Sequence, residues 1–135
     1  MKTNLFFFKT LLLMLLMWNL ISCNSPKTDN PLLDSQWSGV TKVPQEAEIV
    51  LKFSKDKIDV LLGNKVIETM SYTLSNGDIN MEKSSGGTPC STGSKGKYKY
   101  EIIGENLVMT LISDECTARI QSLQGIVFKK TEVKK

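Results

Sequence analysis

The sequence contains no histidine and a single arginine, Arg119, among its 135 residues. Histidine is the commonest general base in enzymes and the commonest protein ligand of metal ions, so its absence disfavours most acid–base mechanisms and most metal sites. No spacing of carboxylates, or of serine and lysine, supplies a substitute, and we interpret the adjacent Asp114 and Glu115 as turn residues. We therefore expect neither an enzyme nor a metal site, and no cofactor.

A surplus of positive charge is also missing from most of the chain. The sequence has 17 basic and 14 acidic residues, but two of the lysines, Lys2 and Lys9, precede residue 23, in a stretch without acidic residues. The remainder holds 15 basic against 14 acidic residues. Because the charges nearly balance, we do not expect the protein to bind nucleic acid. We interpret the lysines of the tail, residues 131–135, as solvent-exposed.

Long apolar runs are confined to the first 22 residues. Residues 6–8 and 11–16 are apolar, the two lysines give a positive start, and Ser22 is a small residue at the end. The strongly apolar part is shorter than the ~20 residues that span a bilayer, and no basic cluster follows it. The pattern predicts an export signal over residues 1–22 and not a membrane helix.

The residues that end this leader, Leu20-Ile21-Ser22-Cys23, resemble the lipobox of bacterial lipoproteins. The resemblance implies cleavage before Cys23, a diacylglycerol on its sulfur, and an acyl chain such as palmitate on the new amino group. Two or more chains hold a protein firmly on a membrane without spanning it. We expect the protein to be located in the bacterial cell envelope, anchored to the outer membrane in preference to the inner membrane. The domain would then lie in the periplasm or at the cell surface. An ordinary cleaved signal is the alternative.

The other two cysteines, Cys90 and Cys116, would then lie in a compartment that permits disulfides. We expect them to pair, closing a loop of about 27 residues and stabilising the fold by roughly 3 kcal/mol. A redox pair or a zinc site is disfavoured, because the sequence has no Cys-x-x-Cys and no histidine.

From Gln36 to Lys130 apolar and polar residues alternate, which is the pattern of half-buried strands. Residues 23–35, rich in Asn, Ser and Pro, precede them and are expected to form a flexible tether. No segment has a helical period, and residues 82–96 are expected to form a long loop. Glu68 falls on an apolar face, which suggests a position at the rim. The expected strands begin at Gln36 and continue over residues 47–53, 57–62, 66–74, 79–81, 97–102, 107–112 and 119–130.

Eight short strands joined by hairpin turns predict an all-β domain over residues 36–130. A meander of this size removes its edges by closing into an antiparallel barrel. A two-sheet sandwich is the alternative. Such a barrel is either filled by side chains or holds one small ligand.

The run Trp37-Ser38-Gly39, the meander, and Arg119 near the last strand resemble the lipocalin-like, or calycin, domains, especially the compact ones on bacterial lipoproteins. In that group a tryptophan on the first strand packs at the closed end of the barrel, and an arginine lies across its ring. The resemblance implies a structural pair of Trp37 and Arg119. In the familiar order the glycine precedes the tryptophan, whereas here Gly39 follows it.

Two classes of function fit this domain. The first is binding of a small apolar or amphipathic ligand inside the barrel. The second is protein interaction: residues 91–94, Ser-Thr-Gly-Ser, resemble part of the inhibitory strand of lysozyme-inhibitor lipoproteins. A purely structural envelope component is a third possibility, and the tyrosines below could equally fill the core. The candidate ligand-binding residues are Ile49, Leu51, Tyr72, Tyr98 and Tyr100.

Overall fold

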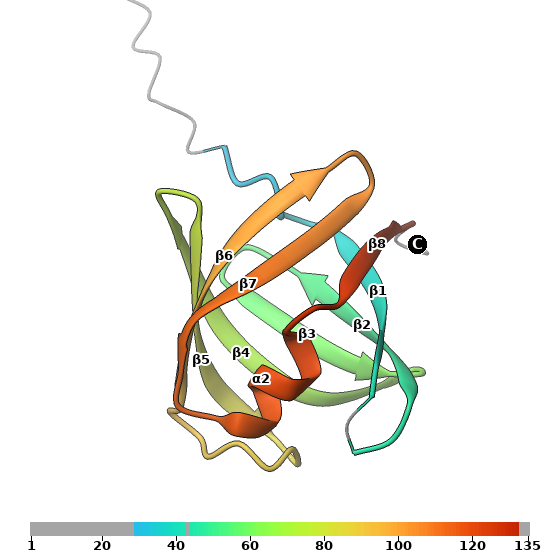
Figure 1. Cartoon of the computed structure of the whole chain (residues 1–135), viewed down its shortest axis with the longest axis vertical. Helices are drawn as coiled ribbons and strands as arrows, with labels where there is room; N and C mark the ends of the chain where they lie inside the picture. The colour runs from blue at the N-terminus through green and yellow to red at the C-terminus, as the bar shows by residue number, and fades with distance from the viewer. Residues whose placement is uncertain (1–28, 43, 133–135) are drawn as a thin grey trace, which may run out of the picture.

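Eight antiparallel strands pair in sequence order, and the first pairs with the last, so that the sheet closes into a barrel (Figure 1). This confirms the expected meander and excludes a two-sheet sandwich. The computed structural model describes residues 29–42 and 44–132. The expected signal, Cys23 and the last three residues lie outside the described residues.

The strands follow the predicted alternation closely along most of the chain. Hairpin turns between them use residues with positive φ, as at Asn76 and Gly77, with φ of 54° and 82°. Such angles are cheap for Asn and Gly, and they match the twist of the flanking strands. The elements are β1 (Gln36–Thr41), β2 (Ala47–Phe53), β3 (Lys57–Leu62), β4 (Lys65–Ser75), β5 (Asp78–Gly86), β6 (Lys95–Ile103), β7 (Asn106–Asp114), α2 (Thr117–Leu123) and β8 (Val127–Thr131).

The expected last strand over residues 119–130 is wrong in its first half, where the chain forms α2. Only Arg119 and Leu123, one turn apart, are buried from this helix. A single turn of spacing between two residues is too short a pattern to reveal a helical period in the sequence. Gly125 (φ 75°) directly follows the C-cap residue Gln124, so it ends the helix.

The expected loop over residues 82–96 is also shorter than predicted, because β5 continues to Gly86 and β6 starts at Lys95. A register shift in the β4–β5 pair, between Thr69 and Met70, lets the extended end of β5 stay paired. Gly86 has a φ of 120°, and a Cβ there would collide with the Ile67 carbonyl oxygen. Glycine is therefore required at this crossing of two backbones.

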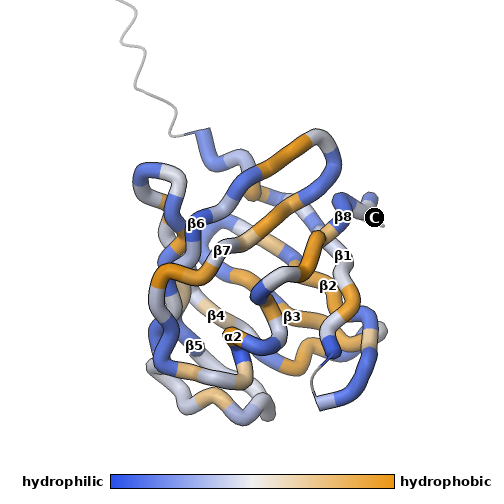
Figure 2. Tube along the Cα trace, in the orientation of Figure 1, coloured by the Kyte–Doolittle hydropathy of each residue, from blue (hydrophilic) through white to orange (hydrophobic). Residues whose placement is uncertain are grey.

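The barrel interior is filled over most of its length. Hydrophobic and hydrophilic residues alternate along the strands (Figure 2), and the inward set includes Trp37, Phe53, Tyr98 and Phe128, each at most 1% exposed. A Cβ on Gly39 would lie 2.7 Å from side-chain atoms of Ile126 and Phe128. Gly39, two residues after Trp37 on the inward face of β1, thus leaves space for the side chains of Ile126 and Phe128.

The two ends of the barrel differ. Because the strands are antiparallel, the β1–β2, β3–β4, β5–β6 and β7–β8 connections share one end, which we call the α2 end. The chain enters at the opposite end, the entry end (Figure 1). There Leu32 is fully buried, and Asn30 Nδ2 donates to the Tyr72 hydroxyl at 2.8 Å. The last residues of the expected tether therefore pack on the barrel and close this end.

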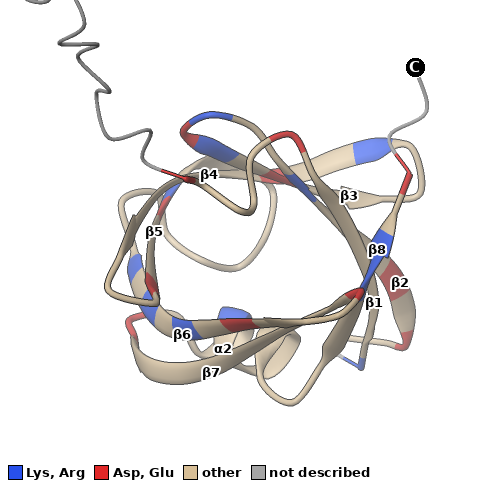
Figure 3. Cartoon of the chain, turned by 90° about the horizontal axis from the view of Figure 1, so that it is seen from above, with Lys and Arg blue, Asp and Glu red and all other residues tan. Residues whose placement is uncertain are grey.

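Seen from above, basic and acidic residues are interspersed around the barrel (Figure 3). Basic and acidic residues pair across strands, as in Lys97 and Asp78 at 3.0 Å. Among the described residues, no helix is long and apolar enough to cross a membrane.

Candidate functional site

A cavity of about 200 Å³ lies at the α2 end, between the barrel wall and the elements that cover it. We call it the α2-end cavity. One side is formed by inward residues of β2, β3 and β4, and the other by α2 and residues 88–90 of the β5–β6 loop. Most of its surface is apolar, and the main apolar residues are Ile49, Val60, Ile67, Met70 and Leu123.

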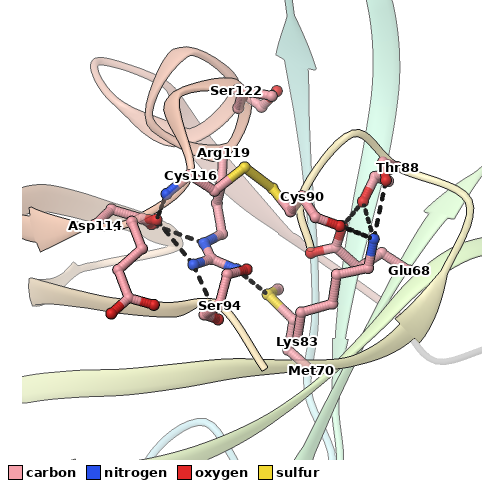
Figure 4. Close-up of a disulfide and its surroundings, with 12 residues drawn as sticks. Glu68, Met70, Lys83, Thr88, Cys90, Ser94, Asp114, Cys116, Arg119 and Ser122 are labelled. Carbon is pink, nitrogen blue, oxygen red and sulfur yellow. Dashed lines mark hydrogen bonds and ion pairs between the residues drawn. A yellow bond between two sulfur atoms is a disulfide. The ribbon is translucent and has the colours of Figure 1, made fainter. Parts of the chain in front are cut away.

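A disulfide joins the two covering elements. Cys90 in the β5–β6 loop is bonded to Cys116, the residue that precedes α2, with Cα atoms 5.5 Å apart. This confirms the expected pairing. The loop is also tied to β5 by backbone bonds, from Gly93 N to Lys83 O and from Lys83 N to Ser94 O. Figure 4 shows the disulfide between the two elements. Loop and helix thus form one cross-linked lid over the cavity.

The buried guanidinium of Arg119 fixes the helix to the end of β7. Its Nε donates to Asp114 Oδ2 at 2.7 Å, and its Nη2 donates to Asp114 Oδ1 at 2.8 Å and to the Ser94 carbonyl at 3.3 Å. The Asp114 carboxylate also accepts the Tyr98 hydroxyl at 2.6 Å and the Cys116 amide at 2.7 Å. A Cβ on Gly96 would collide with this carboxylate, so glycine leaves the space that the ion pair occupies.

The environment of this ion pair holds Arg119 charged and Tyr98 neutral. Burial by itself lowers the pKa of Arg119, but the hydrogen bonds and the charge of Asp114 more than offset it, and the pKa is raised. Burial, followed by the hydrogen bond to Asp114 and its negative charge, raises the pKa of Tyr98. A buried pair of this kind persists only because every charge has close partners.

A second buried pair, Lys83 and Glu68, lies next to the cavity, and Glu68 lines it. Lys83 Nζ is 3.8 Å from Glu68 Oε2 and donates to the Thr88 carbonyl, the Thr88 hydroxyl and the Cys90 carbonyl at 2.9, 2.9 and 2.6 Å. The Thr88 hydroxyl in turn donates to Glu68 Oε2 (Figure 4). The ammonium group therefore holds the β5–β6 loop down on the barrel from inside.

The residues expected to bind a ligand are only partly brought together. Ile49 lines the α2-end cavity, but Leu51, Tyr72 and Tyr98 are buried in the filled interior and Tyr100 packs at its edge. The Tyr72 hydroxyl donates to the Ser54 carbonyl at 2.8 Å, near the entry end, and its ring meets Phe53 edge-on at 5.4 Å between centroids. Burial, the largest cause, raises the pKa of Tyr72.

The expected contact between Trp37 and Arg119 is not the one observed. The cation over the Trp37 ring is Lys130, at 5.8 Å, on the paired strand β8. Trp37 lies at the start of β1, at the entry end, and donates from Nε1 to the Ser35 hydroxyl at 2.7 Å. Arg119 lies at the α2 end, because α2 follows β7, so each residue closes a different end.

Three charged residues of the site were not recognised from the sequence. Glu68 was expected at the rim, but it is 4% exposed and faces the cavity from β4. Lys83 lies in a stretch expected to be a loop, although it continues the inward positions of Ile79 and Met81. Asp114 was interpreted as a turn residue. The signal for the Arg119–Asp114 ion pair was that the only arginine of the sequence lies five residues after an acidic residue.

Two further grooves lie on the outside of the barrel. One, of about 600 Å³, lies outside the disulfide between residues 89–94 and 115–118. It includes Ser91–Ser94, the segment likened to an inhibitory strand, which here is a turn closed from Ser94 N to Ser91 O. The other, of about 570 Å³, crosses the polar outer face of strands β4 to β7. Neither has the apolar walls of the α2-end cavity.

Comparison of the chain with family models, curated proteins and solved structures found no match. Within residues 29–42 and 44–132, no three His, Cys, Asp or Glu side chains are grouped so that they could hold a metal ion. The chemistry of the site is therefore that of an apolar cavity with two buried ion pairs at its edge.

Proposed function

We propose that the protein is a lipid-anchored lipoprotein of the bacterial envelope whose lipocalin-like barrel binds one small apolar or amphipathic molecule. The α2-end cavity is the observation that carries this proposal. Its apolar walls would shield a ligand from water, and burying apolar surface is the main source of such binding. The ion pairs Arg119–Asp114 and Lys83–Glu68 hold the lid in place. Because these charged groups are bonded to one another, we assign them a structural role at a binding site and not a catalytic role.

The size of the cavity limits the ligand. At about 200 Å³ it exceeds the roughly 150 Å³ apolar cavity that accepts benzene, but it is smaller than the ~300 Å³ at which drug-sized sites begin. A long acyl chain does not fit in this space. The expected ligand is a compact molecule not much larger than benzene.

The position of the cavity suits a tethered binding protein. A lipid on Cys23 would join the barrel through a short segment that ends at Asn30 and Leu32, which pack at the entry end. The cavity lies at the opposite end, so the anchor would leave its opening directed away from the bilayer. The protein would then collect a ligand from the surrounding space.

The proposal is tested by methyl NMR on oxidised protein covering residues 24–135, which includes the whole closed barrel and its core. Titration with benzene or cyclohexanol should shift the methyl signals of Ile49, Val60, Ile67, Met70 and Leu123, which line the cavity. Native mass spectrometry of protein taken from the envelope would show whether a natural ligand is bound.

A matched pair of variants on β3 identifies the site. Val60→Phe fills the cavity and should abolish the titration shifts. Leu61→Phe adds the same ring at the next residue, outside the cavity lining, and should leave them unchanged. Binding that survives Val60→Phe, or no binding of any small apolar probe to the parent protein, would refute the proposal.

A further inference from the structure

One nitrogen of Arg119 has almost no partner. Nε and Nη2 are bonded to Asp114 and Ser94, whereas the contact of Nη1 is the Met70 sulfur at 4.0 Å. Thioether sulfur is a weak acceptor, so the N–H groups of Nη1 are poorly satisfied. Among the described residues no oxygen accepts a hydrogen bond from Nη1, and Arg119 lines the α2-end cavity.

Glu68 has the complementary feature. Its Oε2 accepts the Thr88 hydroxyl and faces Lys83, while no donor in the described part of the chain is bonded to Oε1. Glu68 and Met70 both point inward from β4, two residues apart, and both line the cavity. Because Met70 contacts Nη1, the poorly satisfied donor of Arg119 and the unpartnered Oε1 of Glu68 flank the same corner of the cavity. Figure 4 shows Arg119, Met70 and Glu68 together.

The charges around this corner already balance. Arg119 is paired with Asp114 and Lys83 with Glu68, so the four buried groups sum to zero. A carboxylate or an ammonium ligand would add an uncompensated charge to a low-dielectric site, which is costly. A neutral group that both accepts and donates a hydrogen bond would use Nη1 and Oε1 without that cost.

We infer that the α2-end cavity selects neutral ligands whose polar head carries one acceptor and one donor, as in a primary amide, over carboxylates of the same skeleton. The carbonyl oxygen accepts from Arg119 Nη1, and the amide nitrogen donates to Glu68 Oε1. The apolar remainder of the ligand packs on Ile49, Val60 and Leu123. This inference rests on the proposed function, because it concerns the head of the ligand bound there.

Three compounds of equal size test the inference at pH 7: hexanamide, hexanoate and heptan-2-one. Their dissociation constants are measured by methyl NMR titration of the oxidised protein. Hexanamide should bind about tenfold tighter than hexanoate, since a bond to a charged partner is typically worth that factor or more. Heptan-2-one, which accepts but cannot donate, should fall between them.

Removing one charge from the corner should change the preference. Glu68→Gln leaves Lys83 without its carboxylate and makes the site net positive. The affinity for hexanoate relative to hexanamide should therefore rise by about tenfold. Glu82→Gln, on the outer face of the next strand, makes the same charge change and should leave the ratio unchanged. If Glu68→Gln does not fold, the ratio measured on the parent protein decides alone.

The outcomes separate the two proposals. Hexanoate binding as tightly as hexanamide, with heptan-2-one also bound at the cavity methyls, would overturn the inference and leave the binding function in place. Failure of all three compounds to bind would overturn both. A tenfold preference for hexanamide that Glu82→Gln preserves supports both.

Discussion

Arg119 and Asp114 are five residues apart in sequence and are joined by two hydrogen bonds, of 2.7 and 2.8 Å, deep inside the α2 end. Their side chains are 3% and 0% exposed, so this bond closes the turn between β7 and α2 without help from water. The same carboxylate holds Tyr98 and the amide of Cys116. One acidic group thus connects the barrel, the helix and the disulfide.

Removing the charge of Asp114 should therefore destabilise the whole α2 end. Asp114→Asn leaves the Arg119 guanidinium buried without its counter-ion, and breaking a buried pair typically costs about 3–5 kcal/mol of unfolding free energy. Urea denaturation followed by circular dichroism measures the loss.

The control for Asp114→Asn is Asp78→Asn, at a pair with Lys97 that is partly exposed. Exposed pairs contribute at most about 1 kcal/mol, so this variant should unfold near the parent midpoint. If the two substitutions lowered the unfolding free energy equally, the Arg119–Asp114 bond would not have the stabilising role assigned to it.

The strands could be predicted from the sequence because an alternating pattern reports directly on a barrel with one buried face. β2 and β3 have the predicted bounds, and Asn76-Gly77 forms the expected turn. The helix could not be predicted, because only Arg119 and Leu123 mark its buried side.

The candidate site was harder to predict, because it depends on charged residues placed where apolar ones are expected. Glu68 and Lys83 face the interior from the paired strands β4 and β5 and are linked through Thr88, a relationship that the alternation within one strand does not reveal. The register shift at Val60/Leu61 leaves Ile67 of β4 without a partner on β3, and the shift at Thr69/Met70 leaves Ser84 of β5 without a partner on β4, so the alternation is broken at both places. The disulfide was predictable because Cys90 and Cys116 are the two cysteines left after Cys23 in a chain expected to be exported.

Stability should fall at alkaline pH through Tyr98. Its raised pKa means that the folded protein keeps the phenolic proton at pH values where the unfolded chain loses it. The contribution is intact below the unfolded pKa of about 10, and above it the unfolding free energy should fall by up to ~1.4 kcal/mol per pH unit.

Comparison of the parent with Tyr98→Phe between pH 8 and 11 isolates this effect. The variant loses the bond to Asp114 at all pH values, but its stability should fall less steeply above pH 10. Tyr100→Phe removes a hydroxyl from the same strand and controls for the substitution itself. Parallel curves for the parent and Tyr98→Phe would refute the assignment.

Membrane association should depend on Cys23. Cys23→Ser removes the thiol that the proposed lipid modifies, so the protein should move from the membrane fraction to the soluble fraction and incorporate no labelled palmitate. Ser25→Ala, two residues further on, keeps the thiol and should behave as the parent protein. A Cys23→Ser protein that still incorporates labelled palmitate would exclude Cys23 as the lipidated residue.

The disulfide should control both the stability of the lid and access to the cavity. Cys90→Ala with Cys116→Ala releases residues 87–94 from the start of α2, and the loop entropy predicts a loss of about 3 kcal/mol. Lys83 would still bond the Thr88 and Cys90 carbonyls, so the barrel should stay folded while the lid opens more often.

Hydrogen exchange measures this opening directly. Amide exchange should rise in residues 87–94 and in α2 of the double variant, and remain unchanged in β2 and β3 at the far wall. Benzene or cyclohexanol should bind more weakly, because an opened lid no longer shields them from water. Dithiothreitol should reproduce both effects in the parent protein and have none on the double variant. Uniformly faster exchange across all strands would mean instead that the disulfide supports the entire barrel and not the lid.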